Sequence, residues 1–241
     1  MDLPLVWSSR FADGLADWTL LGSGWGLENR SFAPDRAVRG QAFRVFIPAG
    51  SIDPASMKAR GLPYGGTGFK AVVASGGLQR AILKYKVRFP LDFEPARGGK
   101  LPGLCGGACN GAGNIPNGTD GFSARYMWLT AMGGEAYAYL PTSVTYGTGM
   151  TFVGAAFPLG RWVALTQELK LNTPGIANGW IKVWLDGQLV LNQRGLTFRN
   201  TDALAIDRMY FDVFYGGNDD TWAAPKDTVI EFAEFEVYGV R

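Results

Sequence analysis

Short runs of alternating apolar and polar residues, separated by glycine-rich turns, constrain the fold of this chain most strongly. From Arg80 to Phe89 the odd-numbered positions are apolar, while Lys84, Lys86 and Arg88 point the other way. A period of two predicts a half-buried β-strand. The 34 glycines and the lack of long helical periodicity predict many such strands joined by tight turns. We therefore expect an all-β fold and, because no stretch resembles a linker, one domain over residues 1–241.

A β-hairpin is predicted between residues 122 and 140, with its turn at a glycine pair. One face of both strands is apolar and belongs in a core. The other face carries Ser123, Arg125, Tyr137 and Tyr139 and is expected to be the wetter one. Depending on where the hairpin turns, Arg125 lies opposite Tyr139 or opposite Tyr137. A serine, an arginine and two phenols on one surface indicate a site.

The remaining strands follow the same pattern of short apolar runs ended by turn residues. Asp186-Gly187 predicts a tight hairpin turn. The Gly- and Pro-rich segment 51–68 and the stretch around Lys100 are expected to be loops, and residues 3–32 an edge strand with loops. Further strands are expected at residues 42–47, 69–74, 144–146, 152–156, 161–171, 180–185, 188–192, 209–215 and 229–238.

Composition excludes several classes of function. The chain has no histidine, so a Ser-His-Asp triad, a Cys-His pair and an imidazole zinc site are all excluded. Any general acid or base must be a carboxylate, Tyr, Lys or Cys. The formal net charge of +2 argues against a general nucleic-acid binder. No stretch is apolar enough to span a membrane, and no signal peptide is visible.

Two pairs of residues leave alternatives open. Cys105 and Cys109 are four residues apart in a glycine-rich stretch. They could form a small disulfide in an oxidising compartment or stay as free thiols, and two ligands make a poor metal site. Asp219 and Asp220 could hold a structural calcium ion, although adjacent acids are more often ordinary loop residues.

Four blocks resemble polysaccharide lyase family 14, namely GGKLPGL, FSARYMW, GGEAYAYLP and FYGGNDDTWAAPKD. The related glucuronan lyases of family 20 share the general architecture. The resemblance covers roughly residues 85–237. It implies a β-jelly roll, a sandwich of two antiparallel sheets with a concave substrate groove. It also implies β-elimination on uronic-acid polymers such as alginate, polymannuronate or glucuronan, by a secreted enzyme that acts as a monomer and requires no cofactor.

The resemblance assigns five catalytic positions, Lys100, Ser123, Arg125, Tyr137 and Tyr139. β-Elimination removes the proton beside a uronate carboxylate and expels the glycosidic oxygen at C4. Arg125 and Lys100 are expected to stabilise the charge that spreads into the carboxylate. Tyr139 is expected to be the base, and to serve as the acid for the leaving oxygen. Tyr137 assists it, and Ser123 positions the sugar chain.

The substrate contacts are expected to extend along the groove. The three cations that follow residue 83 predict a basic wall for an acidic polymer, although such a run is more often a solvated sheet face. The expected contacts are Lys84, Lys86, Arg88, Met127 and Glu135.

Other functions remain compatible with the pattern. A non-catalytic carbohydrate-binding module would use the eight tryptophans for stacking, but most of them fall on apparent core faces. A glycoside hydrolase needs two carboxylates beside the bond, and the predicted site offers Glu135 without an evident partner. An arginine opposite a tyrosine can also be a simple packing pair. The cysteine pair after Lys100 departs from the family pattern and puts the subsite preference in doubt.

Overall fold

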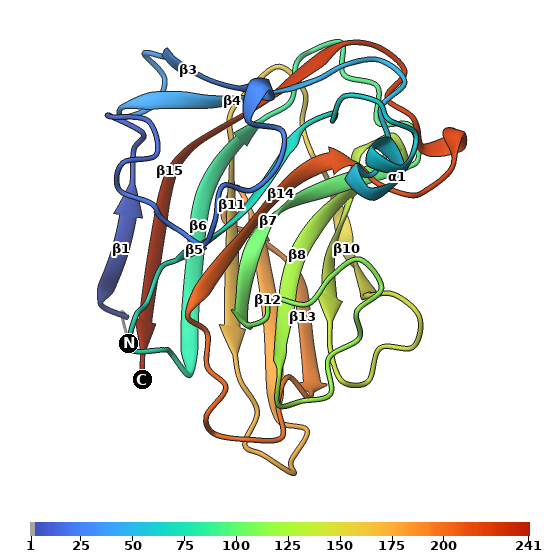
Figure 1. Cartoon of the computed structure of the whole chain (residues 1–241). Coiled ribbons are helices and arrows are strands. Elements are labelled where there is room, and N and C mark those ends of the chain that lie inside the picture. Colours follow the sequence, from blue (N-terminus) through green and yellow to red (C-terminus); the bar gives the residue numbers. More distant parts are fainter. Residues whose placement is uncertain (1–2) are drawn as a thin grey trace.

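The computed structural model describes residues 3–241, which form two antiparallel sheets packed face to face (Figure 1). We call the eight-stranded one the back sheet and the seven-stranded one the groove sheet. In the back sheet the hydrogen-bonded order is β13 (Gln188–Leu196), β12 (Gly179–Leu185), β11 (Val163–Lys170), β6 (Arg80–Arg88), β15 (Thr228–Val240), β4 (Gln41–Ile47) and β3 (Arg30–Pro34), with β1 (Leu5–Ser9) also paired to β15. In the groove sheet the order is β10 (Thr148–Ala156), β9 (Gly133–Tyr139), β8 (Gly121–Leu129), β7 (Gly98–Gly107), β14 (Arg208–Tyr215), β5 (Thr67–Val72) and β2 (Thr19–Leu20). The expected all-β sandwich is confirmed.

The core lies between the two sheets and is rich in aromatic rings. In β6 the alternating residues Leu83, Tyr85 and Val87 are buried, and in β8 Tyr126 and Trp128 are fully buried. Tyr85 and Tyr126 meet across the core, with ring centroids 6.3 Å apart. Burial of such large apolar surfaces is the dominant stabilising contribution to the fold. The period-two pattern of the sequence therefore decides which face of each strand turns inward.

One strand occupies a stretch that was expected to be a loop. The glycine-rich segment from Gly98 to Gly107 is β7, and it is hydrogen bonded on both sides, to β8 and to β14. Its glycines disfavour a strand by propensity, but close packing requires them. A Cβ at Gly99 would overlap the ring of Trp128, and one at Gly103 would overlap the carbonyl of Ala124. The expectation of a loop around Lys100 is therefore wrong.

Smaller differences concern the connections. The segment expected to be loop at 51–68 contains α1 (Pro54–Ala59), which begins at Asp53, whose carboxylate accepts the N–H groups of Ala55 and Ser56. Residues 144–146 form no strand. The remaining helical turns are η1 (Leu27–Asn29), η2 (Thr130–Met132) and η3 (Asp220–Trp222). No helix within residues 3–241 has the length and apolarity needed to cross a membrane.

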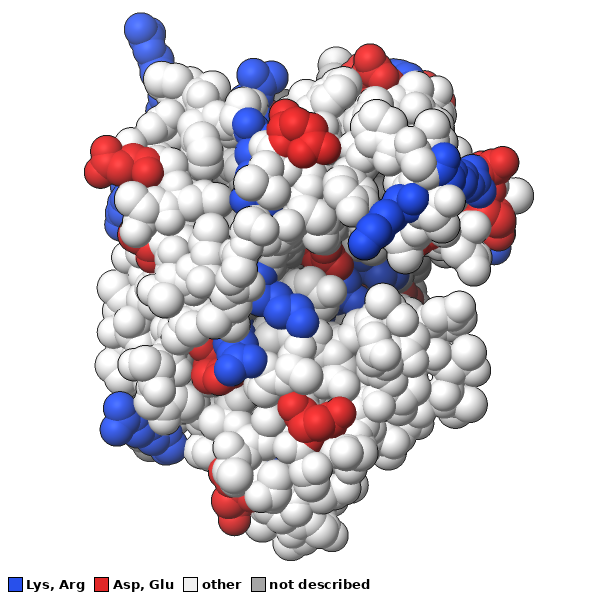
Figure 2. Space-filling model, in the orientation of Figure 1, with Lys and Arg blue, Asp and Glu red and all other residues white. Residues whose placement is uncertain are grey.

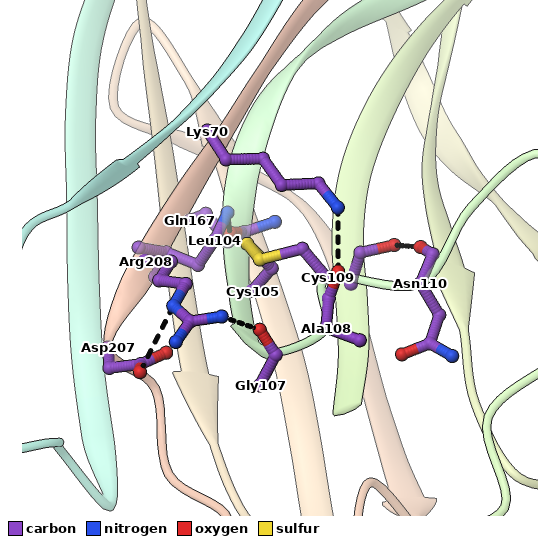
Figure 3. Close-up of a disulfide and its surroundings, with 11 residues drawn as sticks. Lys70, Leu104, Cys105, Gly107, Ala108, Cys109, Asn110, Gln167, Asp207 and Arg208 are labelled. Atoms are coloured by element: carbon purple, nitrogen blue, oxygen red, sulfur yellow. Dashed lines mark hydrogen bonds and ion pairs between the residues drawn. A yellow bond between two sulfur atoms is a disulfide. The ribbon is translucent and has the colours of Figure 1, made fainter. Parts of the chain in front are cut away.

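Two sequence signals are resolved by the structure. Asp186 and Gly187, with φ of 48° and 81°, form the tight turn between β12 and β13 that the Asp-Gly pair predicts. Cys105 and Cys109 are joined in a disulfide, so of the two alternatives the bonded one is found. This bond ties the end of β7 to the loop that follows it (Figure 3).

Candidate active site

The site is built on the hairpin of β8 and β9, which η2 connects. Its register pairs Arg125 with Tyr137 and Ser123 with Tyr139, which is one of the two arrangements expected from the sequence. Because Tyr126 and Trp128 face the core, these four side chains face the opposite side of the groove sheet. That side is less exposed to solvent than expected. Ser123, Arg125 and Tyr139 are each at most 2% exposed, because loops cover the sheet there.

A cavity of about 700 Å³ opens on this face of the groove sheet. Figure 2 shows the molecular surface hollowed on this side, with basic and acidic atoms visible inside the hollow. The walls come from α1, Trp25, Tyr146 and the segment 217–222. The polar floor crosses four neighbouring strands and consists of Lys100, Arg125, Glu135, Tyr137, Tyr139, Tyr210 and Asp212.

A buried ion pair lies at the centre of this floor. The Arg125 guanidinium binds the Asp212 carboxylate at 2.5 Å, and both side chains are almost completely buried. Burial raises the pKa of Asp212 to about 6, although Arg125 opposes the rise. Asp212 in turn raises the pKa of Tyr210, whose ring lies 4.4 Å from the guanidinium carbon. The pair fixes the arginine, and its planar face is held by an aromatic ring.

Lys100 lies beside this pair with little polar support. Its ammonium group contacts the Met127 sulfur at 2.7 Å and lies 3.9 Å from the ring centroid of Tyr137. Burial, together with the charge of Arg125, lowers the pKa of Lys100 to about 7. The lowered pKa brings the unprotonated amine of Lys100 within reach near neutral pH.

The two phenols are held by backbone groups. The Gly113 N–H donates to the hydroxyl of Tyr139 at 3.0 Å, and the Gly147 N–H donates to that of Tyr137 at 3.1 Å. The rings are nearly perpendicular, with centroids 5.7 Å apart. Burial raises the pKa of Tyr137, and the neighbouring Tyr139 raises it further. A phenol oxygen that accepts an N–H in this way keeps its own proton available for donation.

Glu135 is the other carboxylate of the floor. It lies at the β10 side of the cavity, where it pairs with Thr151 in the strand register and its carboxylate lies against Gly149. Burial raises the pKa of Glu135, and the charge of Lys100 opposes the rise. The chemistry that these groups can perform is proton transfer beside a fixed arginine.

Comparisons with known proteins agree with this geometry. The sequence pattern of the family described as Polysaccharide lyase 14 matches residues 35–235. The chain belongs to polysaccharide lyase family 14. The match begins well before residue 85, so the family resemblance extends further toward the N-terminus than the sequence blocks indicate. No curated protein matches the chain.

Solved structures similar to this family 14 member include polysaccharide lyases. The PL-14 alginate lyase from Aplysia kurodai shares 28% identity and a TM-score of 0.84, over 98% of this chain and 99% of that one. A variant of alginate lyase Aly36B in complex with alginate trisaccharide gives 20% identity and a TM-score of 0.77, over 99% and 100%. An endo-β-1,4-glucuronan lyase from Trichoderma reesei gives 12% identity and a TM-score of 0.62, over 98% of this chain and 96% of that one. The last two similarities concern the fold.

Ser123 does not line the cavity of this family 14 member. Its hydroxyl is fully buried and donates to the Asn110 carbonyl at 2.6 Å. The expected role of positioning the sugar chain therefore has no direct contact to support it. The hydrogen bond instead holds the loop from which Gly113 reaches Tyr139.

The expected basic wall lies on the wrong side of the sandwich. Because Leu83, Tyr85 and Val87 face the core, the cations between them face outward from the back sheet, away from the cavity. Their partners are also there, since Lys84 lies over the Tyr238 ring, Lys86 pairs with Glu234, and Arg88 pairs with Glu231 and Asp35. The prediction that Lys84, Lys86 and Arg88 line the groove is wrong, whereas Met127 and Glu135 do line it.

The sequence reasoning missed the contribution of β14. Tyr210 and Asp212 alternate with Met209, Phe211 and Val213, which are fully buried in the core. The same period-two rule that identified the hairpin places them on the groove face. An aspartate in the middle of an otherwise apolar strand was the available signal. Trp25 in the walls lies at an isolated bridge to Gly68 and Trp222 at the end of the short turn η3, where no periodicity identifies them.

The acidic pair at 219–220 has other partners. Asp219 accepts the backbone N–H of Thr221 at the start of η3, and Asp220 pairs with Arg60 at 2.6 Å. Within residues 3–241 no group of three or more His, Cys, Asp or Glu side chains is arranged to hold a metal ion. Calcium binding by Asp219 and Asp220 stays a prediction.

Proposed function

We propose that this family 14 member cleaves uronic-acid polymers by β-elimination, using Lys100, Tyr139 and Arg125. The observation that carries the proposal is the gathering of a buried amine, a fixed guanidinium and two phenols on the floor of one cavity. In a chain without histidine, the amine and the phenols can move a proton, and the guanidinium can stabilise negative charge.

Arg125 is proposed to neutralise the carboxylate of the sugar that loses its proton. The C5 proton of a uronate is weakly acidic until charge can spread into the neighbouring carboxylate. Arg125 lines the cavity and is fixed by Asp212, so it needs little reorganisation as that charge develops. Loss of one such donor typically lowers the rate by about 10²- to 10³-fold.

Lys100 is proposed to take the C5 proton. Its pKa of about 7 lies close to neutral pH, and a general base is most efficient when its pKa is near the working pH. The sequence suggested Tyr139 for this role, but a phenol must first lose its proton to act as a base, and an unprotonated amine is ready. The C5–H bond breaks, the proton moves to Lys100, and the electron pair forms the C4–C5 double bond as the C4–O bond breaks.

Tyr139 is proposed to protonate the leaving oxygen. Its hydroxyl accepts the Gly113 N–H, which orients the phenol and leaves its proton free to be donated. The same N–H also stabilises the phenolate that remains after proton transfer. Exchange with solvent then restores the protonated phenol and the neutral amine. Tyr137, under Lys100, holds the amine in place and contacts the sugar.

The substrate is proposed to be alginate, with polymannuronate and glucuronan as the neighbouring candidates. The PL-14 protein from Aplysia kurodai is an alginate lyase, and the Aly36B variant is in complex with an alginate oligosaccharide. The more distant Trichoderma protein is a glucuronan lyase. The disulfide suits an oxidising compartment, so we further propose that the enzyme is secreted. That it acts as a monomer without a cofactor stays a prediction.

One assay tests the proposal against its alternatives. The protein is incubated with alginate, polymannuronate, polyguluronate and glucuronan while ultraviolet absorbance and reducing ends are followed. A lyase generates both signals, because the new double bond is conjugated with the carboxylate. Reducing ends without absorbance would indicate a hydrolase. Binding with neither signal would indicate a carbohydrate-binding module, and either result would overturn the proposal.

A further inference from the structure

Lys70 on β5 lies just beyond the cavity, on the same face of the groove sheet. Its register partner on β14 is Tyr210, which belongs to the cavity floor. The ammonium group lies 5.0 Å from the centroid of the Tyr210 ring and donates to the Ala108 carbonyl at 2.7 Å. Figure 3 shows the side chain extended toward the loop beside the disulfide. A lysine donates up to three hydrogen bonds, so two of its N–H groups remain for a ligand.

The charge of Lys70 has no carboxylate partner within ion-pair distance among residues 3–241. Two acids of β14 and the segment before it are engaged elsewhere, since Asp212 binds Arg125 and Asp207 binds Arg208. Burial is the main cause that lowers the pKa of Lys70; the charge of Asp212 opposes it, and the nearby Arg125 and Arg208 lower the pKa further. A half-buried cation next to two others is a position that an anion would stabilise.

The direction of the cavity leads to this position. Its floor crosses β9, β8, β7 and β14 in turn, and β5 is the next strand. Neighbouring strands are about 4.8 Å apart, a spacing close to the length of one sugar unit in a 1,4-linked polymer. A polymer lying across the strands therefore advances by about one sugar per strand. It meets Lys70 after it has passed Arg125 and Tyr210.

The two ends of this path differ in charge. At the β10 end the floor carries Glu135, and at the β5 end it continues to Lys70. We propose that Lys70 forms an outer subsite that binds a uronate carboxylate beyond the catalytic residues. The inference rests on the proposed function, which it deepens by assigning the anion-binding end of the groove. A chain too short to reach β5 gains nothing from Lys70.

The test separates the charge of Lys70 from its hydrogen bond to Ala108. Lys70→Gln removes the charge and keeps a donor, Lys70→Met removes both, and Lys70→Arg keeps the charge. The matched control is Lys84→Gln, because Lys84 lies over a tyrosine ring at 4.8 Å on the opposite surface of the sandwich. Binding of alginate and of oligosaccharides of two to eight sugars is measured by calorimetry at low and high salt, beside KM and kcat.

Lys70→Gln and Lys70→Met are expected to weaken binding of alginate and longer oligosaccharides about five- to tenfold. kcat should stay within about twofold, the salt dependence of binding should become shallower, and disaccharide binding should not change. Lys70→Arg and Lys84→Gln should behave like the wild type. Wild-type affinity in Lys70→Gln would overturn the inference, and so would a loss in Lys70→Met alone. Because binding is measured directly, absence of an ultraviolet signal would count against the proposed function and not against the subsite.

Discussion

The backbone N–H of Gly113 donates to the hydroxyl of Tyr139 across 3.0 Å, so a loop outside the sheet orients a side chain on its floor. That loop is held at its start by the Cys105–Cys109 disulfide and in its middle by the hydrogen bond from Ser123 to Asn110. The disulfide therefore lies only four residues from the group that orients the proposed acid. The disulfide is thus linked through this short backbone to the orientation of the Tyr139 phenol.

Loss of the disulfide is expected to lower turnover more than substrate affinity. In the Cys105→Ser/Cys109→Ser variant, kcat should fall several-fold while KM changes little, because Gly113 loses its fixed position but Arg125 does not. Closing so short a loop contributes only about 2 kcal/mol to the free energy of unfolding. The measurement is steady-state kinetics on alginate, beside urea unfolding.

A reductant provides the control for this prediction. Dithiothreitol should lower kcat of the wild type toward that of the serine variant and leave the variant unchanged. Equal activity of oxidised and reduced wild type would show that the loop holds Gly113 without the disulfide.

The pKa of Lys100 predicts the pH dependence of catalysis. The unprotonated amine is the active form of the proposed base, and burial lowers the pKa of Lys100 to about 7. kcat/KM should therefore be low in acid and should rise as the pH passes through about 7. Lys100→Met should remove this rise together with most of the activity, and Lys100→Arg should not restore it, since a guanidinium stays protonated. An acid limb unchanged in either variant would assign the base to another residue.

The sequence predicted the β8–β9 hairpin of the site better than the neighbouring strand β7. The hairpin was visible because residues 122–130 and 135–140 alternate with a period of two. Its register could not be predicted, because Ala131 and Met132 in the turn have φ of 56° and 61°. Alanine and methionine rarely adopt this left-handed backbone, so their identity does not indicate it.

Long-range pairing explains the main error. Alternation correctly put Lys84 and its two companions on one face of β6, but it does not say which sheet a strand joins. β6 pairs with β11 and β15, which follow it by about 75 to 150 residues in the chain, so its outer face belongs to the back of the molecule. The glycines of β7 misled for a related reason. They are required by neighbours distant in sequence, and not by a turn.

Tyr139→Phe tests the proposed acid directly. Removing the hydroxyl should reduce kcat by about 10²- to 10⁴-fold and leave polymer binding and the fold intact, because the ring keeps its packing. The matched control is Tyr126→Phe, the same change on the core face of the same hairpin. The buried hydroxyl of Tyr126 has no hydrogen-bond partner among residues 3–241, so its loss should change neither kcat nor stability appreciably. Near-normal turnover in Tyr139→Phe would remove Tyr139 from proton transfer.

The buried ion pair of Arg125 and Asp212 predicts an asymmetric effect of pH on stability. Removing either partner leaves a buried charge, at a cost of about 3–5 kcal/mol in the free energy of unfolding at pH 8. The pKa of Asp212 is about 6 in the fold against an ordinary value of 3.8, and without Arg125 it should rise further. A carboxyl with a raised pKa contributes stability at low pH and loses it as the pH rises through the folded value. Arg125→Met should therefore be much less damaging at pH 5 than at pH 8.

The reverse substitution has no such relief. Asp212→Leu leaves a buried guanidinium that cannot give up its proton, so the variant should not recover stability at pH 5. Its cost relative to the wild type should be larger at pH 5 than at pH 8, because the wild type gains stability at low pH from the raised pKa of Asp212. The double variant Arg125→Met/Asp212→Leu should recover most of the lost stability at both pH values, because no buried charge remains, while its activity stays absent. Urea unfolding of the four proteins at the two pH values measures these differences. A double variant as unstable as the sum of the singles would mean that the pair is not coupled and that Asp212 does not hold Arg125 in place.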